Sequence, residues 1–285
     1  MRYQCFDFSI DQKIAHLRFN RPDAMNTMQP VFFRELVNIL QQLQREASAR
    51  VLVISSTGKH FTAGMALDVF AAGGGITLDD QQAVGRANIA LALQEMHQSF
   101  NLIEQLRMPV ITAIHGGCIG GGVDLICAAD IRLASQDAFF CIQEINIGMT
   151  ADLGTLQRLP KLIPEGIVHE MAYTGRRLPA ARAQAVGLIN EVFETQQAML
   201  DAAIQMAKEI TEKPPVAIWG SKQAIHYARD HSTQDALQQM GWLQSGIWQS
   251  ANLMEAFMAK QQGRAPQFAD LATLHPFNEA PYQLK

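Results

Sequence analysis

A run of glycines between residues 115 and 125 carries the first chemical signal in this chain. The segment reads HGGCIGGGVDL, with five glycines and with Asp124 close to its end. Glycines at this density let backbone N–H groups approach a ligand without obstruction from side chains. Three kinds of ligand use such a turn: a nucleoside triphosphate, a dinucleotide, and a carbonyl oxygen that becomes negatively charged during a reaction.

The residues around the glycines argue against the first two ligands. A triphosphate loop needs Lys and then Ser or Thr after its second glycine, and Gly122 and Val123 stand there instead. A dinucleotide fingerprint needs GxGxxG, which the glycines at 116, 117, 120, 121 and 122 do not form. The remaining chemical interpretation is a helix that begins near Gly120 and offers free N–H groups to an oxyanion. A second interpretation stays open: the glycines serve only close helix packing, and Asp124 is a favourable acid in the first helical turn.

Alternating strands and helices over the first two-thirds of the chain are expected to position this turn. Runs rich in apolar residues predict strands at 14–19, 51–55, 109–114 and 130–135. Apolar residues at helical spacing predict helices at 30–46 and around 88–106, and a glycine-rich loop, AAGGGITLDD, spans 71–80. This order is typical of an α/β fold with mostly parallel strands.

The last third of the chain has a different pattern, without predicted strands. The pattern predicts only helices, at 196–210, 215–229 and 233–263, and little regular structure over 264–285. The helices have too many apolar residues for a solvated surface, so they are expected to pack on one another or on a second subunit. We therefore divide the chain into a core at 1–195 and a C-terminal helical oligomerisation region at 196–285.

Composition excludes several classes of partner. The 285 residues are 48% hydrophobic and 18% charged, and the formal net charge is −4. No basic run suggests a nucleic acid, and no apolar run reaches the roughly 18 residues that cross a membrane. The four cysteines show no CxxC pairing and read as reduced, buried thiols. The chain begins without the charged and apolar segments of an export signal and does not end in a peroxisomal address, so the expectation is a soluble, cytoplasmic protein without a metal site.

Four segments together resemble one protein family. They are NRPDAMNTM (20–28), TGKHFTAGMAL (57–67), HGGCIGGGVDL and VGLINEVF (186–193), and they occur in order over nearly the whole chain. In this order they resemble the crotonase superfamily of acyl-coenzyme A enzymes. The resemblance implies a spiral of ββα units with a C-terminal helical region, assembled as a homo-trimer or homo-hexamer. It also implies an acyl-CoA thioester as substrate and no cofactor, because coenzyme A is part of the substrate.

The resemblance also implies which residues contact the thioester. Carried onto this chain, the two oxyanion-hole N–H groups belong to Met65 and Gly121, and the substrate-binding residues are Ala63, Gly64, Met65, Ala66, Leu67 and Gly121. Family members commonly have Asp at the position of Ala66. Because the expected donor is a backbone N–H group, this departure leaves the oxyanion hole intact and puts in doubt only a loop contact made by that aspartate.

Three carboxylates distinguish the reactions within the superfamily. Asp124, Glu144 and Asp152 follow one another at separations of 20 and 8 residues. Enoyl-CoA hydratases usually have glutamates at the first two positions and glycine at the third. The set in this chain is instead similar to the isomerases that convert 3,5-dienoyl-CoA to 2,4-dienoyl-CoA in the β-oxidation of unsaturated fatty acids.

The chemistry of that isomerisation requires two separated acids. Removing a proton from C2 gives an enolate whose charge extends to C6, where a proton must be returned. We expect Glu144 to act at C2 and Asp152 to act as a protonated acid at C6, although the two roles can be exchanged. Asp124 is expected to be charged at the helix start and to orient its neighbours. Taken singly, Asp152 can also be a helix cap and Glu144 a solvated loop carboxylate.

Two other functions remain open at this stage. An enoyl-CoA hydratase would add water to 2-enoyl-CoA and would tolerate the loss of the Asp152 carboxylate. A non-catalytic scaffold would bind acyl-CoA or a protein without changing it. The preferred acyl chain length and the residues that contact the coenzyme A phosphates do not follow from the sequence.

Overall fold

Two sheets form the centre of the molecule, which we describe from a computed structural model over residues 3–70 and 81–275. The larger sheet has the order β1-β2-β3-β4-β6-β9; only β1 and β2 pair antiparallel. Its strands are β1 (Phe6–Asp11), β2 (Ile14–Phe19), β3 (Val51–Ser56), β4 (Val110–Ile114), β6 (Ile131–Ser135) and β9 (Glu191–Phe193). The smaller sheet consists of β5 (Gly117–Ile119), β7 (Phe139–Cys141) and β8 (Leu178–Pro179).

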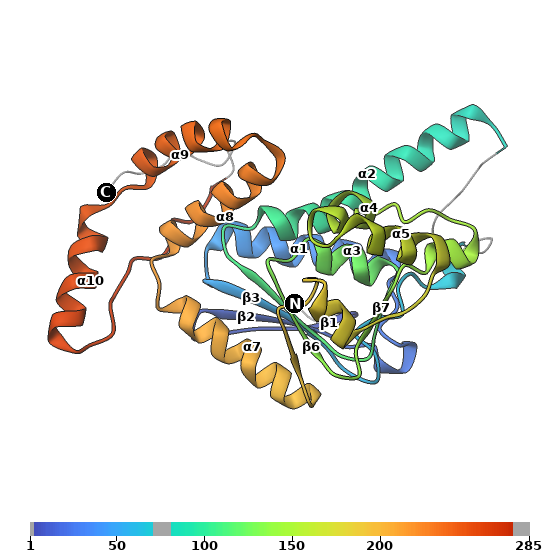
Figure 1. Cartoon of the computed structure of the whole chain (residues 1–285), viewed down its shortest axis with the longest axis horizontal. Helices are drawn as coiled ribbons and strands as arrows, with labels where there is room; N and C mark the ends of the chain where they lie inside the picture. Colours follow the sequence, from blue (N-terminus) through green and yellow to red (C-terminus); the bar gives the residue numbers. More distant parts are fainter. Residues whose placement is uncertain (1–2, 71–80, 276–285) are drawn as a thin grey trace.

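Helices surround both sheets (Figure 1). The α-helices are α1 (Pro30–Glu46), α2 (Ala83–Gln105), α3 (Gly121–Cys127), α4 (Thr155–Arg158), α5 (Glu165–Thr174), α6 (Ala180–Ala185), α7 (Gln196–Thr211), α8 (Pro215–Asp230), α9 (Thr233–Ile247) and α10 (Ser250–Gln262). Short 3₁₀ helices are η1 (Pro22–Ala24), η2 (Leu67–Phe70), η3 (Glu144–Ile147) and η4 (Leu159–Lys161).

The chain repeats one unit as it winds through the two sheets. A strand of the larger sheet, such as β4, is followed by a strand of the smaller sheet, β5, and then by a helix, α3. The bridge between Thr62 and Cys118 extends the smaller sheet toward the segment after β3. This arrangement confirms the predicted α/β spiral of ββα units.

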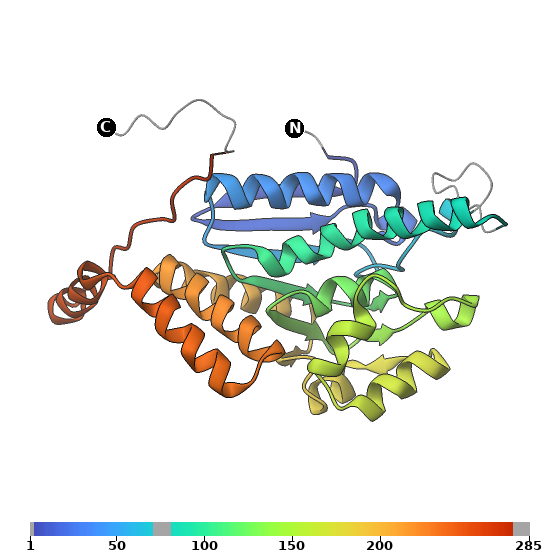
Figure 2. The same ribbon diagram turned by 90° about the horizontal axis from the view of Figure 1, so that it is seen from above.

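The larger sheet is buried on both faces, which explains its continuous apolar strands. On one face, Leu52 and Ile54 of β3 belong to the same buried cluster as Leu36 and Leu40 of α1. On the other face, Val51 and Val53 cluster with residues of α7. Figure 2 shows α1 on one side of the sheet. Helix α7, which the predicted division at residue 195 assigns to the helical region, thus covers the sheet.

The C-terminal helices extend away from the sheets, and α10 lies at the end of the molecule in both Figure 1 and Figure 2. The helical stretch predicted at 233–263 is two helices, because the chain turns at Trp248 and Gln249, whose backbone is extended. The exposed apolar side chains of this region are Leu237, Trp242, Trp248, Leu253, Met254, Phe257 and Met258. The predicted loop at 71–80 lies outside the described residues.

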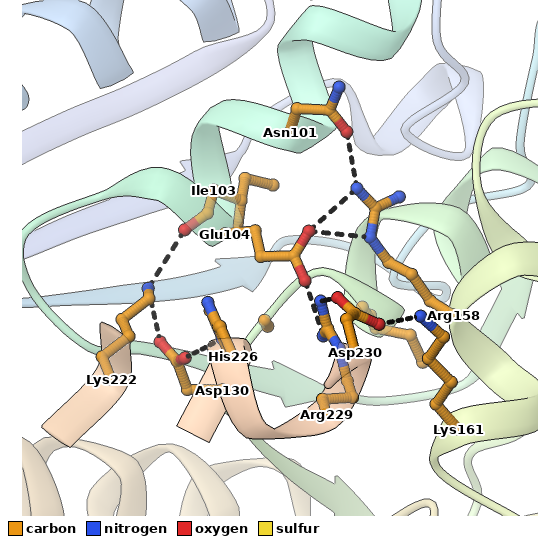
Figure 3. Close-up of polar contacts among 12 residues, drawn as sticks. Asn101, Ile103, Glu104, Asp130, Arg158, Lys161, Lys222, His226, Arg229 and Asp230 are labelled. Carbon is orange, nitrogen blue, oxygen red and sulfur yellow. Dashed lines mark hydrogen bonds and ion pairs between the residues drawn. The ribbon is translucent and has the colours of Figure 1, made fainter. Parts of the chain in front are cut away.

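A buried ion pair fastens α8 to the core. The Lys222 ammonium group lies 2.8 Å from an Asp130 carboxylate oxygen and also donates to the carbonyl groups of Ile103 and Met108 (Figure 3). Lys222 is buried, and an ammonium group in that position is tolerated only with partners of this kind.

Among the described residues, no helix has both the length and the hydropathy needed to cross a membrane.

Candidate active site

The glycine run forms the turn between β5 and α3, and its glycines have different tasks. Gly120 has φ 54° and ψ −122°, a conformation that residues with side chains rarely adopt, and it immediately precedes α3. A Cβ atom on Gly122 would lie 2.4 Å from the Thr62 side chain. The packing interpretation therefore applies to Gly122, whereas Gly120 and Gly121 line an open cavity.

The segment after β3 faces this turn. Gly64 has φ 83°, and a Cβ atom on it would lie 2.8 Å from the Ile119 carbonyl oxygen, so only glycine lets the two segments come this close. The Gly64 N–H donates to the Thr62 hydroxyl group, and the Ala66 N–H donates to the Met28 carbonyl. Between them, the Met65 N–H is left without an acceptor in residues 3–70 and 81–275.

The backbone N–H group of Gly121 is unpaired in the same way as that of Met65. It is the first residue of α3, and its N–H has no acceptor within the described part of the chain. Both residues line one cavity of about 330 Å³. Two unpaired backbone donors at one cavity can stabilise a carbonyl oxygen that gains negative charge.

Most of the predicted site residues meet at this cavity. Its lining includes Ala63, Gly64, Met65, Leu67, Gly121, Glu144 and Asp152. Ala66 and Asp124 are buried and are not among the residues that line the cavity. The remaining lining is mostly apolar, with Ile119, Ile147, Met149 and Leu153 as the largest aliphatic side chains. The cavity therefore has room for an apolar chain beside a few polar groups.

Glu144 begins η3 and lies against the glycine turn. A Cβ atom on Gly120 would be 3.0 Å from its Oε1 atom, so the glycine makes room for the carboxyl group. The Oε2 atom is buried and has no hydrogen-bond partner among the described residues. Burial, and next the charge of Asp124, raise the Glu144 pKa from 4.5 to about 7. Glu144 is thus no solvated loop carboxylate, and a group of this pKa can accept a proton near neutral pH.

Asp124 corrects one expectation from the sequence. Its side chain is 1% exposed, and its Oδ1 atom accepts a 2.6 Å hydrogen bond from the Thr155 N–H. We expected the helix start to favour the charged form, but burial raises the Asp124 pKa to about 6. The pKa shifts upward because α3 has only seven residues and removal of the carboxyl group from water outweighs its small dipole. With a pKa of about 6 the group is still mostly ionised near pH 7.

Asp152 lies in the segment that joins η3 to α4. The N-cap of α4 is Gly154, without a side-chain hydrogen bond, so Asp152 is not a helix cap. Burial raises the Asp152 pKa, while the nearby His97 lowers it. A raised pKa keeps a carboxyl group protonated over a wider pH range, as a proton donor requires.

Sequence reasoning missed three residues at this site. The His97 Nε2 atom lies 2.6 Å from the Asp152 carbonyl oxygen, Thr155 holds Asp124, and Arg177 lines the cavity with its guanidinium over the Phe139 ring. The sequence assigns none of these three residues a role. Their roles arise from contacts between segments far apart in the chain, and no sequence pattern reports such contacts.

Comparisons with known proteins agree with this arrangement. The family model described as enoyl-CoA hydratase/isomerase matches residues 9–270. The mitochondrial delta(3,5)-delta(2,4)-dienoyl-CoA isomerase of Homo sapiens is 40% identical over 259 residues, which cover 90% of this chain and 78% of that protein. The peroxisomal enzyme of the same name from Arabidopsis thaliana is 36% identical over 267 residues, which cover 92% and 94%.

Solved structures show the same fold. An enoyl-CoA hydratase from Bacillus anthracis superposes with a TM-score of 0.84 at 28% identity and covers 93% of this chain and 99% of its own. The enoyl-CoA hydratase from Mycobacterium tuberculosis H37Rv has a TM-score of 0.79 at 30% identity and covers 93% and 98%.

The same relatives overturn one prediction and establish the family. They are named as mitochondrial or peroxisomal proteins, which contradicts the expected cytoplasmic localisation. That expectation was wrong because it rested only on the lack of recognisable targeting segments. The matches extend over nine-tenths of the chain. With the two glycine turns and the cavity between them, they show that the chain belongs to the enoyl-CoA hydratase/isomerase family.

Proposed function

We propose that this protein is a dienoyl-CoA isomerase that converts 3,5-dienoyl-CoA to 2,4-dienoyl-CoA in the β-oxidation of unsaturated fatty acids. The observation that carries the proposal is the presence of two carboxyl groups with raised pKa, Glu144 and Asp152, at one cavity with two unpaired N–H groups. Relatives that are 40% identical to this chain over 259 residues are named for that reaction.

The reaction begins at the thioester. Its carbonyl oxygen accepts hydrogen bonds from the N–H groups of Met65 and Gly121, which makes the protons at C2 more acidic. The ionised Glu144 carboxylate removes one proton from C2, and the electron pair moves into a trienolate whose negative charge extends to C6. Loss of one such N–H donor typically raises the barrier by about 3 to 4 kcal/mol.

The second half of the reaction returns a proton at the far end. Protonated Asp152 donates to C6, and the double bonds shift to C2=C3 and C4=C5. The substrate loses one proton and gains one, so no oxidant, metal or cofactor is consumed. Asp124 holds the Thr155 N–H and raises the Glu144 pKa, which gives it an orienting and electrostatic role.

The test follows the absorbance of the conjugated product. Purified protein is expected to convert a 3,5-dienoyl-CoA to a species that absorbs as a 2,4-diene, and Asp152→Asn is expected to abolish most of this activity while coenzyme A binding survives. Asp201→Asn, which neutralises an exposed carboxylate on α7, serves as the control. An inactive native protein, or full activity in Asp152→Asn, would refute the proposal.

One observation favours a second candidate, an enoyl-CoA hydratase. The similar solved structures carry that name, and Asp124 and Glu144 stand where hydratases usually have two glutamates. In this chain, however, Asp124 is engaged by Thr155 and does not line the cavity. A hydratase would add water to 2-enoyl-CoA faster than it isomerises a diene, and would tolerate Asp152→Asn.

We also propose assembly as a homo-trimer or homo-hexamer. Trp242 and Trp248 are 77% and 59% exposed in the single chain, and Phe257 is 63% exposed. Aromatic side chains at this exposure favour a covered surface between subunits. Sedimentation velocity is expected to show a species of at least three chains, which Trp242→Ser together with Phe257→Ser would shift toward the monomer. A native monomer at all concentrations would contradict it.

A further inference from the structure

Asp152 is a half-buried residue in an irregular segment between two cavities. Residues 149–154 form neither helix nor strand. On one side lies the active-site cavity, and on the other lies a second cavity of about 380 Å³, whose lining includes His97, Asn101, Gln157 and Arg158. Asp152 and Leu153 line both cavities. Ala151 and Leu153 are anchored in the core, whereas Asp152 between them is only half-buried and has open space on both sides, so its own position depends on hydrogen bonds.

Two hydrogen bonds from neighbouring helices hold the backbone at Asp152 and just after it, at Thr155. The His97 Nε2 atom lies 2.6 Å from the Asp152 carbonyl oxygen, and because a carbonyl oxygen only accepts, Nε2 carries the proton. Three residues further on, the Thr155 N–H donates to Asp124, also at 2.6 Å. The first bond comes from α2 and the second from α3, so two separate helices fix the segment.

Helix α2 is itself fastened to the residues that follow Asp152. The Arg158 guanidinium donates to Asn101 at 2.6 Å and pairs with Glu104 at 3.1 Å (Figure 3). Arg229 of α8 pairs with the other oxygen of Glu104 at 2.6 Å. These contacts keep α2, α4 and α8 together around the second cavity, so His97 projects from a fixed helix.

We propose that His97 is a positioning residue for the proton donor at C6: its hydrogen bond to the Asp152 backbone holds the Asp152 carboxyl group at the active-site cavity. The proposal rests on the isomerase function proposed above. It gives His97 no contact with substrate, because of these two cavities His97 lines the second and not the active-site cavity. Without the bond, Asp152 can shift toward either cavity, and a displacement of 1 Å at a reacting group lowers a rate by about 10²-fold.

The first test replaces His97 by residues of graded hydrogen-bonding capacity. His97→Gln keeps an N–H donor of similar reach, whereas His97→Leu removes the donor and His97→Asn shortens it. We expect kcat to fall about 10²-fold in the Leu and Asn variants and to stay within about threefold of native in the Gln variant. KM is expected to change little, because His97 does not contact the substrate. Gln98→Leu, on the exposed face of the same helix, is the matched control.

The second test does not depend on activity. Amide hydrogen exchange of the peptide that contains residues 152–155 is expected to be about tenfold faster in His97→Leu and His97→Asn than in the native protein and in Gln98→Leu. Native kcat in the Leu and Asn variants, or unchanged exchange in this peptide, would overturn the proposal. A native protein without isomerase activity would instead refute the proposed function, while the exchange measurement would still decide whether His97 holds the segment.

Discussion

Replacing the half-buried Glu144 with glutamine is expected to make the protein more stable at alkaline pH while it removes the activity. The Glu144 Oε2 atom is buried without a partner among the described residues, and its pKa rises from 4.5 to about 7 on folding. Below about pH 4.5 the group is neutral in both states and costs nothing. As the pH rises, the unfolded chain ionises first and becomes relatively more stable. Above about pH 7 the full penalty is present.

The size of the penalty follows from the two pKa values. A carboxyl group whose pKa rises from 4.5 to about 7 destabilises the folded state by about 3 kcal/mol once it is fully ionised. Glutamine has nearly the same shape and no charge. Glu144→Gln should therefore exceed the native protein in unfolding free energy by about 3 kcal/mol near pH 8 and by less than about 1 kcal/mol near pH 5.

Urea unfolding at both pH values measures this difference. Protein concentration must be the same throughout, since assembly contributes to apparent stability. Glu95→Gln, which removes an exposed carboxylate from α2, is the control and should show no pH-dependent gain. An equal effect of Glu144→Gln at the two pH values would show that the Glu144 pKa is not raised, and the assignment of this residue as a base near neutral pH would lose its physical support.

Two further substitutions test the glycine turn and the buried ion pair. Gly64→Ala places a Cβ atom 2.8 Å from the Ile119 carbonyl oxygen and displaces the Met65 N–H, so kcat/KM should fall about 10²-fold, which steady-state kinetics would reveal; native kinetics would show that this N–H is not used. Lys222→Met leaves the half-buried Asp130 without its 2.8 Å cationic partner and should cost about 3 kcal/mol of unfolding free energy, as measured by urea denaturation. A loss below about 1 kcal/mol would contradict this reading.

Helices and strands with strong apolar patterns were predictable from the sequence. The stretch 30–46 is α1 with the same bounds, and the four predicted strands are β2, β3, β4 and β6. Strand β1 was missed because FDFSID mixes acids into a short alternation. The strands of the smaller sheet have two or three residues, too few to show a period. The break between α9 and α10 has no proline and could not be anticipated.

At the site, the glycines and carboxylates could be identified in advance, because resemblance to a family fixes which residues belong together. What could not be identified is how the fold surrounds them. The Asp124 pKa shifts opposite to expectation, since burial is a property of the folded chain. His97 comes from a helix with no site motif, and its contact with Asp152 spans 55 positions.

The central claim is that one proton leaves C2 and another arrives at C6. The most direct measurement is conversion of a 3,5-dienoyl-CoA in D₂O, with the product examined by mass spectrometry and NMR. We expect a 2,4-dienoyl-CoA of unchanged composition apart from deuterium at C6, because Asp152 draws its proton from solvent. A product that has gained a molecule of water, or deuterium at C4 with none at C6, would contradict the account.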